Sequence, residues 1–367
     1  MRHHHKKICI VSISLGIGGA ERSSAILSQM LTGLGHDVHI VILNNVVDFD
    51  YEGTLLNLGS LKESSNTVVS RVMRFKRLRT YLKKQSFDLI IDHRTKTDYF
   101  KEYFYHSYVY KGLNRAYVVH SSNPDLYLTQ YPNRFKNIYN KNRFTVGVSK
   151  YITEEILQKK GIRNCHTVYN AFDASWNDMN EVLPQTLKDK KYILSYGRIE
   201  EEVKDFRFLI QSFTNSNVWQ DGIYLVIMGE GKDKDSLIEF ALESPASKQI
   251  LFLPYSKNPV PYILHAHFIT LTSHFEGFPM VLVESLSLGV PVLSLDIISG
   301  PSEIVKHEEN GLLISKRSIP LFSEGIQRMC FDKELHEHCK QNAKDSVSQF
   351  STDAISQCWN NLLQNEL

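Results

Sequence analysis

The chain alternates short apolar segments with longer amphipathic ones along almost its whole length, in two successive series. This alternation is typical of α/β folds, in which helices cover the buried strands of a parallel sheet. We therefore expect two Rossmann-like, doubly wound domains that face each other across a cleft at the carboxyl ends of both sheets. The expected strands are residues 7–13, 38–43, 87–92, 115–120 and 144–149, then 192–197, 223–229, 250–254, 267–272, 291–296 and 311–315.

A polar stretch at residues 171–190 separates the two series and is the expected linker. We expect a first domain at residues 1–170 and a second at residues 171–345. Residues 346–367 are expected to form a C-terminal helix that packs back on the first domain.

Three absences narrow the class of protein. No apolar run reaches the roughly 18 residues that a membrane-spanning helix needs. The N-terminus is basic but has neither a long apolar segment nor a small-residue cleavage site, so it reads as the first strand and not as a signal peptide. The cysteines are scattered and odd in number, which is typical of reduced thiols in the cytoplasm and predicts no disulfide or metal framework: Cys9, Cys165, Cys330, Cys339 and Cys358.

The charge is divided unequally between the two series. Residues 1–170 carry 25 Lys and Arg against 13 Asp and Glu, a net of +12, whereas residues 171–367 carry 17 against 27, a net of −10. Such a division indicates that the first half faces an anionic partner. Without a zinc-finger, RRM or helix-turn-helix pattern, nucleic acid is disfavoured. An anionic membrane surface or a phosphate-bearing acceptor fits better.

The segment 273–289, SHFEGFPMVLVESLSLG, has the signals of a loop followed by a helix. Pro279 suits the first helical turn and Gly289 the position just after the end, so Glu284 is expected within the helix and Glu276 in the preceding loop. Free N–H groups at such a helix start bind anions. Eight helical residues span about 12 Å, more than the roughly 5–9.5 Å between glycosidase carboxylates. The two acids are therefore expected to contact different parts of one ligand.

Two loops that follow predicted strands carry residues suited to a phosphate. Glycines in the loop at residues 14–21 let the backbone approach a phosphate or sugar, although a tight turn is the alternative. The dinucleotide fingerprint is incomplete there, because Glu21 stands at its third glycine position. In the loop at residues 197–205, GRIEEEVKD, Arg198 and Lys204 are suited to one diphosphate. The alternative is that both side chains are simply solvated.

The first half contains a candidate site residue and a candidate surface. His120 closes a predicted strand and is expected to point into the cleft, with a structural role as the alternative. Residues 68–84 carry apolar residues at helical spacing among seven basic ones. They predict either a core-facing helix with a solvated basic face or a membrane-surface helix. The aromatic residues at 99–110 suit a core, an acceptor groove or an interfacial patch equally.

Together these motifs resemble those of the family-4 retaining glycosyltransferases, which have the GT-B fold and belong to glycosyltransferase group 1. The resemblance runs nearly from end to end. It consists of GGAE at 18–21, GR…K at 197–204, FEGFPMVLVESLSLGVPVLS at 275–294, GPSEI at 300–304 and NGLLI at 310–314. One departure is the acidic stretch between the Arg and the Lys, which weakens phosphate binding if its glutamates point inward and has no such effect if they face solvent.

The resemblance implies side-chain roles at five positions. In that family an Arg and a Lys bind the donor diphosphate, and a helical Glu contacts the ribose hydroxyls. A loop Glu and a strand-end His of the first domain lie near the transferred sugar. The corresponding residues are Arg198 and Lys204, Glu284, and Glu276 with His120. Of these, Glu276, His120, Arg198 and Lys204 are the implied catalytic group.

Other implied donor contacts come from the turn after the loop Glu, from a strand end that holds the base, and from the N-terminal glycine loop. These positions are Gly277, Phe278, Pro279, Met280, Val281, Leu253, Pro254, Gly18 and Gly19.

The resemblance further implies a retaining hexosyltransferase with an acceptor-binding first domain and a donor-binding second domain. The implied donor is UDP-Gal, UDP-GalNAc or UDP-GlcNAc, and the acceptor is a growing, lipid-linked glycan of a surface polysaccharide. The enzyme is expected in the cytoplasm, held to the inner face of the plasma membrane by its basic first domain. No cofactor, metal or nucleic acid is implied, in keeping with the absence of an Asp-x-Asp pair on a suitable loop. The alternatives are a GDP-mannose-dependent mannosyltransferase, a nucleotide-sugar epimerase of the same fold, and a non-catalytic binding protein.

Overall fold

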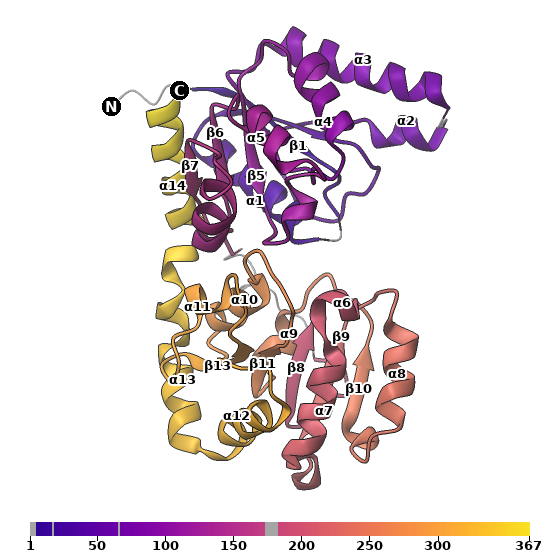
Figure 1. Cartoon of the computed structure of the whole chain (residues 1–367). Helices are drawn as coiled ribbons and strands as arrows, with labels where there is room; N and C mark the ends of the chain where they lie inside the picture. Colours follow the sequence, from indigo (N-terminus) through magenta and orange to yellow (C-terminus); the bar gives the residue numbers. More distant parts are fainter. Residues whose placement is uncertain (1–4, 17, 65–66, 173–182) are drawn as a thin grey trace. The chain divides into compact units, whose positions relative to one another are not determined.

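A computed structural model describes residues 5–16, 18–64, 67–172 and 183–367 (Figure 1). It divides into two compact units, each of which is described here by itself. The first comprises Met1–Ala171 with Thr352–Leu367, and the second Phe172–Ser351. Half of the expected linker, residues 173–182, lies outside the described residues.

The first unit is built on one parallel sheet of seven strands, in the order β3-β2-β1-β4-β5-β6-β7. The central strand β1 is buried at every residue after its first, as expected for a strand covered by helices on both faces. The strands are β1 (Lys7–Ser12), β2 (Asp37–Ile42), β3 (Thr54–Asn57), β4 (Leu89–Asp92), β5 (Arg115–Val119), β6 (Phe144–Gly147) and β7 (Cys165–Thr167). The helices are α1 (Gly19–Gly33), α2 (Gly59–Ser64), α3 (Val68–Gln85), α4 (Tyr99–Phe104), α5 (Pro132–Tyr139) and α14 (Thr352–Glu366), with 3₁₀ or π segments η1 (Tyr105–Val109), η2 (Pro124–Leu126) and η3 (Ile152–Gln158).

The C-terminal helix α14 belongs to this first unit although the second unit separates it in sequence. It packs against α1. At its end the Glu366 carboxylate accepts a hydrogen bond from Asn164 at 2.9 Å and lies 3.3 Å from His166. These contacts attach the chain end to the edge strand β7.

The second unit contains a parallel six-stranded sheet in the order β10-β9-β8-β11-β12-β13. A buried apolar cluster that includes Ile193, Phe213 and Leu225 packs the helices onto it. The strands are β8 (Tyr192–Tyr196), β9 (Tyr224–Met228), β10 (Ile250–Leu253), β11 (Phe268–Leu271), β12 (Val292–Leu295) and β13 (Gly311–Ile314). The helices are α6 (Glu201–Lys204), α7 (Phe206–Ser216), α8 (Lys234–Leu242), α9 (Val260–Leu264), α10 (Met280–Ser287), α11 (Pro301–Ile304), α12 (Ile319–Phe331) and α13 (Lys333–Ser346), with 3₁₀ segments η5 (Val218–Asp221), η6 (Ser247–Gln249) and η7 (Ser348–Phe350).

All eleven expected strands are present in these two sheets. The structure adds two strands that the sequence did not predict, β3 and β7, both at an edge of the first sheet. They are short, and none of their residues is fully buried, so they lack the apolar run that marks the central strands. In both sheets the strand order reverses beside the first strand: between β1 and β4 in the first unit, and between β8 and β11 in the second. Ligands of doubly wound folds bind at such reversal points, outside the carboxyl ends of the strands.

Candidate functional site: an ion pair in the second unit and a histidine pair in the first

The helix predicted after the loop of Glu276 is α10, Met280–Ser287. Pro279 is its N-cap, one position earlier than the predicted first turn, with φ −75° and ψ 90°. Proline suits that position as well, because the N-cap N–H is not needed for helix hydrogen bonds. Gly289 follows the helix end with φ +80°, as predicted, and a side chain there would be strained.

The turn Gly277–Pro279 is held in place by the loop that follows β12. Ser299 donates a hydrogen bond to the Gly277 carbonyl at 2.9 Å. A Cβ on Gly300, whose φ is +97°, would lie 2.3 Å from Pro279 Cδ, so only glycine allows this close approach. Phe278 is buried against Phe350, with ring centroids 5.0 Å apart. The aromatic ring of Phe278 therefore belongs to the core, and its backbone is the part left for a ligand.

Glu276 and Lys204 form an ion pair across the reversal point of the second sheet. Lys204, the last residue of α6 after β8, donates through Nζ to Glu276 Oε1 at 2.6 Å. Ser273, just after β11, donates to the same oxygen at 2.7 Å. The two charged side chains are only 17% and 15% exposed. A cation and a carboxylate that follow neighbouring strands are thus brought together.

Three further residues connect the loop of Lys204 to the loop of Glu276. The Thr272 hydroxyl donates to the carbonyls of Lys204 and Asp205 at 3.0 and 3.2 Å. The His274 N–H donates to the Val203 carbonyl at 2.8 Å. Arg317, which follows β13, forms an ion pair with Asp205 and donates to the Ser273 carbonyl at 2.6 Å. The pair is held by a fixed framework, which is the preorganisation that electrostatic catalysis needs.

The acidic stretch beside Arg198 is mostly turned away from this pair. Glu201 accepts hydrogen bonds from the N–H groups of Phe206 and Arg207 at 3.1 and 3.0 Å, at the start of α7. Glu202 is 84% exposed and lies 3.5 Å from Lys232. Only Glu200 lies near Arg198, with 3.5 Å between their charged atoms, and the Arg198 side chain is 51% exposed. One of the three glutamates therefore lies close to Arg198, and two do not.

Glu284 is buried within α10, with 3% of its surface exposed. The Tyr196 hydroxyl, at the end of β8, donates to Glu284 Oε2 at 2.6 Å. This hydrogen bond fixes the carboxylate at the carboxyl end of the central strand, the same edge of the sheet as Lys204. Charge-assisted hydrogen bonds of this kind are short and strong.

The predicted base-binding positions, Leu253 and Pro254, lie at the end of the edge strand β10. The Leu253 carbonyl accepts a hydrogen bond from the Gly229 N–H at 3.0 Å. Gly229 has no room for a side chain, because its Cβ would lie 1.9 Å from the Gly197 carbonyl oxygen. The loops after β8, β9 and β10 are therefore packed backbone against backbone at this edge. Their arrangement leaves Pro254 exposed.

In the first unit the predicted glycine loop lies directly after β1. Gly19 is the first residue of α1, and Gly18 is the N-cap with φ +154°. A Cβ on Gly18 would lie 2.2 Å from a carboxylate oxygen of Glu21. Residue 17, within this loop, lies outside the described residues.

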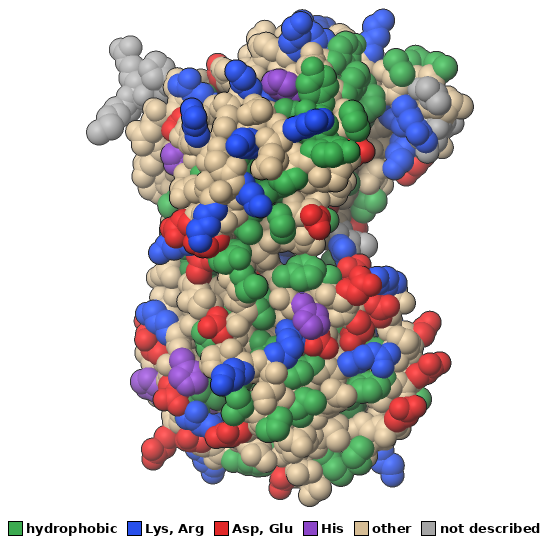
Figure 2. Space-filling model, viewed as in Figure 1, with side chains coloured by type: hydrophobic (Ala, Val, Ile, Leu, Met, Phe, Trp, Pro, Cys, Tyr) green, Lys and Arg blue, Asp and Glu red, His purple; other side chains and the backbone are tan. Residues whose placement is uncertain are grey.

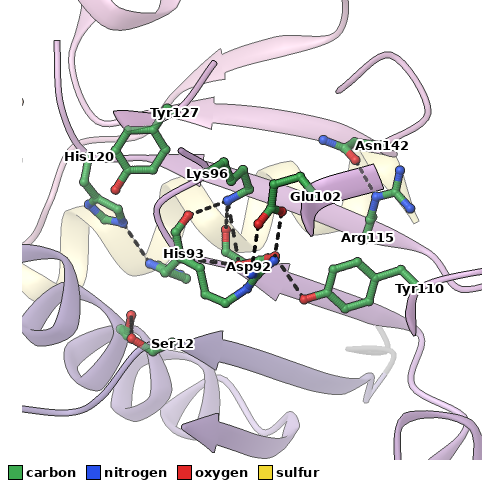
Figure 3. A network of polar contacts seen from close by, with 12 residues as sticks. Ser12, Asp92, His93, Lys96, Glu102, Tyr110, Arg115, His120, Tyr127 and Asn142 are labelled. Carbon is green, nitrogen blue, oxygen red and sulfur yellow. Dashed lines mark hydrogen bonds and ion pairs between the residues drawn. The ribbon is translucent and has the colours of Figure 1, made fainter. Parts of the chain in front are cut away.

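His120 follows β5 directly and is paired with a second histidine that the sequence analysis did not single out. His93, the residue after β4, has its Nδ1 2.9 Å from His120 Nε2, and the rings are stacked with centroids 5.1 Å apart (Figure 3). Among the described residues neither His93 Nε2 nor His120 Nδ1, both buried atoms, has a hydrogen-bond partner. The pair therefore offers two unsatisfied ring nitrogens at the carboxyl end of the sheet.

A buried charge network lies beside the histidine pair at the end of β4 (Figure 3). Arg94 donates to Asp92 at 2.7 Å and to both carboxylate oxygens of Glu102, at 3.2 and 3.1 Å. Lys96 Nζ donates to the Arg94 carbonyl at 2.6 Å and lies 3.7 Å from Asp92. Burial opposes ionisation of Asp92, but the charges of Arg94 and Lys96 outweigh it and lower its pKa to about 2. The network contains two buried cations and two buried carboxylates, so its net charge is zero. Burial of an unpaired charge would be costly.

The histidine pair makes the stability of the fold sensitive to acid. Burial is the main cause that lowers the pKa of His93 from 6.5 to about 3. Between these values the unfolded chain binds a proton that the folded chain excludes. The contribution of His93 to the free energy of unfolding is therefore complete above pH 6.5 and is lost as the pH falls towards 3. The expected loss from His93 is about 2 kcal/mol at pH 5.

The measurement is the free energy of unfolding in urea at pH 7.5 and at pH 5.0. Replacing His93 by Gln is expected to reduce the slope of the free energy of unfolding against pH by about 1.4 kcal/mol per pH unit over this acidic range. The same substitution at the exposed His338 is the matched control. An identical pH dependence in the wild-type chain and the His93→Gln variant contradicts the assignment.

The residues that the sequence analysis missed are the polar partners of those it found: Tyr196, Thr272, Ser273, Ser299 and Arg317 in the second unit, and His93 in the first. A usable signal exists for some of them, because Tyr196, Thr272, Ser273 and His93 stand at or just after the carboxyl end of a predicted strand. Arg317 and Ser299 lie in loops with no such mark.

Comparison with known proteins identifies the family. A family model described as Glycosyltransferase Family 4 matches residues 17–176, and one described as Glycosyl transferases group 1 matches residues 180–346. Together the two matches cover most of the chain, one for each series of strands.

Individual proteins agree with this result. The N-acetylgalactosamine-N,N'-diacetylbacillosaminyl-diphospho-undecaprenol 4-alpha-N-acetylgalactosaminyltransferase of Campylobacter jejuni is 27% identical, over 96% of this chain and 97% of its own. The lipopolysaccharide 1,6-galactosyltransferase of Salmonella typhimurium is 28% identical over 53% of this chain and 54% of its own. The crystal structure of Anabaena HepE with UDP and glucose superposes with a TM-score of 0.79, at 17% identity, over 98% of this chain and 100% of that one. The chain thus belongs to the family-4, group 1 glycosyltransferases and has their GT-B fold of two Rossmann-like domains.

Proposed function

We propose that this glycosyltransferase moves a sugar from a UDP-sugar to a growing, lipid-linked glycan in surface polysaccharide biosynthesis, with retention of anomeric configuration. UDP-GalNAc is the first donor to test, followed by UDP-Gal and UDP-GlcNAc. The Campylobacter relative, similar over nearly its whole length, is named for transfer of N-acetylgalactosamine to a diphospho-undecaprenol-linked acceptor. The observation that carries the proposal is the ion pair of Lys204 and Glu276 at the reversal point of the second sheet.

The proposed donor site uses each group of the second unit for one part of the donor. Lys204 and Arg198 bind the diphosphate and neutralise the charge that develops on it as the bond to the sugar breaks. In the present structure the Lys204 ammonium is held by Glu276. Binding of a diphosphate supplies Lys204 with a second anionic partner, which leaves Glu276 able to interact with the sugar.

The remaining groups position the nucleoside. Glu284, fixed by Tyr196, accepts hydrogen bonds from the ribose hydroxyls, and backbone at Leu253 and Pro254 contacts the base. The start of α10, where Met280 and Val281 are half-buried, faces phosphate or sugar together with the backbone of Gly277, since free helix N–H groups favour anions. His120, Gly18 and Gly19 are the proposed contributions of the first domain. No metal is required in this scheme, because two cations and a helix start take its place.

The proposed membrane contact is the first half of α3. Leu78 and Leu82 are buried, as a core-facing helix requires, but three apolar side chains nearer its start face solvent. Val69, Val72 and Met73 are 68%, 61% and 64% exposed, and basic residues surround them. An exposed apolar face with basic neighbours is typical of an interfacial helix. None of the described helices is both long and apolar enough to cross a bilayer.

Charge reversal on α3 tests the membrane contact. Replacing Arg74, Arg77 and Arg79 by Glu is expected to abolish sedimentation with vesicles that contain phosphatidylglycerol, because each basic residue near an anionic surface contributes about 1 kcal/mol. Binding of UDP should not change. The matched control reverses three exposed lysines of the second unit, Lys248, Lys316 and Lys333. Equal vesicle binding by both triple variants and the wild-type chain contradicts a membrane role for α3.

The proposed transfer is tested first without an acceptor. The full chain is incubated with EDTA and one donor at a time: UDP-GalNAc, UDP-Gal, UDP-GlcNAc, UDP-Glc or GDP-mannose. Slow release of UDP from one of the three proposed donors supports the proposal and identifies the sugar. Release of GDP from GDP-mannose instead, or conversion of a donor sugar to its epimer without release of nucleotide, contradicts it.

A further inference from the structure

A pocket of about 430 Å³ lies on the first unit at the amino ends of the strands, whereas His120 lies at their carboxyl ends. Arg115, which lines it, is the first residue of β5, whereas His120 follows the last. His106 of η1 also lines the pocket, together with Lys111 after η1 and Lys141 after α5. The pocket therefore opens at the amino ends of the strands, away from the proposed sugar site.

Arg115 is a fixed cation at the base of this pocket. It is 3% exposed, and its Nε donates to Asn142 Oδ1 at 2.7 Å. Its Nη2 donates to the Ile138 carbonyl at 3.2 Å and contacts His106 Nδ1 at 2.8 Å. Arginine has no acceptor atom, so His106 Nδ1 accepts, and the proton of the neutral imidazole sits on Nε2. His106 thus adds an N–H donor to the pocket.

The charges that line the pocket are not compensated. Burial, followed by the charges of Arg115 and Lys141, lowers the pKa of His106. No carboxylate lines the pocket, and within the described part of the chain Lys111 and Lys141 have no ion-pair partner. Both lysines are exposed, so their ammonium groups are free to turn towards a ligand. Three cations and one N–H donor without an acid form a site for an anion.

The surroundings indicate which anion. The volume lies within the range of small-ligand pockets, roughly 300–1,000 Å³, and flexible lysines around a fixed arginine suit the several oxygens of a phosphate. Exposed aromatic side chains lie on the same segment as His106: Tyr103, Phe104 and Tyr108 are 52%, 38% and 37% exposed. Figure 2 shows an apolar area on the first unit with basic side chains along its border.

We propose that this pocket binds a phosphate group, either that of a lipid headgroup or that of a soluble phosphorylated compound. Both sources present the oxygens of a singly or doubly charged phosphate group to Arg115, Lys111 and Lys141. The aromatic neighbours would contact the membrane interface in the first case and are not needed in the second. The proposal does not depend on glycosyl transfer, because none of these residues belongs to the proposed donor site.

The test removes the two exposed charges and leaves the buried Arg115 in place. The Lys111→Gln/Lys141→Gln variant of the full chain is compared with wild type and with a matched Lys101→Gln/Lys160→Gln variant. Lys101 lies on α4, beside the aromatic residues, and does not line the pocket. Binding is measured by calorimetry with inorganic phosphate, and by sedimentation with phosphatidylcholine vesicles that contain phosphatidic acid. The thermal midpoint of each variant shows whether it is folded.

The expected result is a loss of phosphate or vesicle affinity of about tenfold or more in the pocket variant and little change in the matched variant, because charge-assisted hydrogen bonds to phosphate are lost only in the first. Loss in the vesicle assay alone assigns a lipid headgroup, and loss with inorganic phosphate assigns a site for soluble compounds as well. Absence of binding by the wild-type chain in both assays, or equal losses in the two variants, overturns the proposal. Release of UDP from the donor is measured in parallel and is expected to be the same in all three proteins.

Discussion

Replacing Glu276 by Gln is expected to abolish sugar transfer while the protein still binds UDP. The carboxylate makes two short hydrogen bonds in the present structure, with Lys204 and Ser273. In the proposed site it acts on the sugar, which UDP lacks. In the proposed mechanism its charge acts near the sugar, where loss of one electrostatic contribution reduces kcat by about 100- to 1,000-fold. The measurement pairs the rate of UDP release from the chosen donor with the dissociation constant of UDP.

Ser273→Ala provides the matched control for Glu276. It removes the second hydrogen bond to the same carboxylate oxygen without removing the charge, so it should cost far less activity than Glu276→Gln. A parallel loss of UDP affinity and of activity in Glu276→Gln would show that the residue acts through the fold of the loop, and its assigned role would be wrong.

Replacing Lys204 by Ala is expected to weaken UDP binding as well as transfer. Lys204 is the cation that the fold places at the reversal point of the sheet, and it is assigned to the diphosphate. Loss of a hydrogen bond to a charged group costs about 1.5–3 kcal/mol, or roughly 10- to 150-fold in affinity. Calorimetry with UDP measures it directly. The exposed Lys232, whose ion-pair partner among the described residues is Glu202, is the control position at which alanine should change nothing.

The two substitutions together separate a functional ion pair from a structural one. If Lys204 and Glu276 only stabilise the loops, each variant loses the same contact, and UDP affinity falls equally in both. In the proposed site the effects differ, because Lys204→Ala removes a phosphate ligand while Glu276→Gln removes a competitor for the same ammonium. UDP binding that is as weak in Glu276→Gln as in Lys204→Ala would contradict the assignment.

The sequence predicted the features of the fold that depend on local patterns. The buried strands are runs of apolar residues, and Pro279 before α10 and Gly289 after it stand at positions where their backbone preferences are unambiguous. Strands β3 and β7 escaped prediction because their residues are only partly buried or exposed, so no apolar run marks them. These edge segments form strands because they pair with a neighbouring strand, and the local sequence pattern does not reveal that pairing.

The candidate site shows the same limit. Glu276, Glu284 and Lys204 were found because they belong to motifs with fixed spacing. Tyr196, which binds Glu284, and Arg317, which binds Asp205 next to Lys204, were not found, because these contacts join segments that are far apart in sequence. In the first pair 88 residues separate the partners, and in the second 112. Which polar residues meet in three dimensions depends on strand order, and strand order is a property of the whole sheet.

Helix α3 illustrates how one pattern can satisfy two interpretations. Its apolar residues have the spacing of a core-facing helix, and Leu78 and Leu82 do face the core. Val72, one helical turn before Phe75, is nevertheless 61% exposed, whereas Leu78 and Leu82 further along the helix are buried. Periodicity gives the face of a helix but not the length over which a partner covers that face.

The most direct test of the central claim is the structure of the product formed from UDP-GalNAc and a short-chain, diphosphate-linked glycan acceptor. The account predicts that one N-acetylhexosamine is added by the wild-type chain, that it is not added by Glu276→Gln, and that its anomeric carbon has the α configuration of the donor in the NMR spectrum. A β-linked product would contradict the retaining mechanism. Failure to extend any such acceptor with any of the three proposed donors would contradict the proposed function itself.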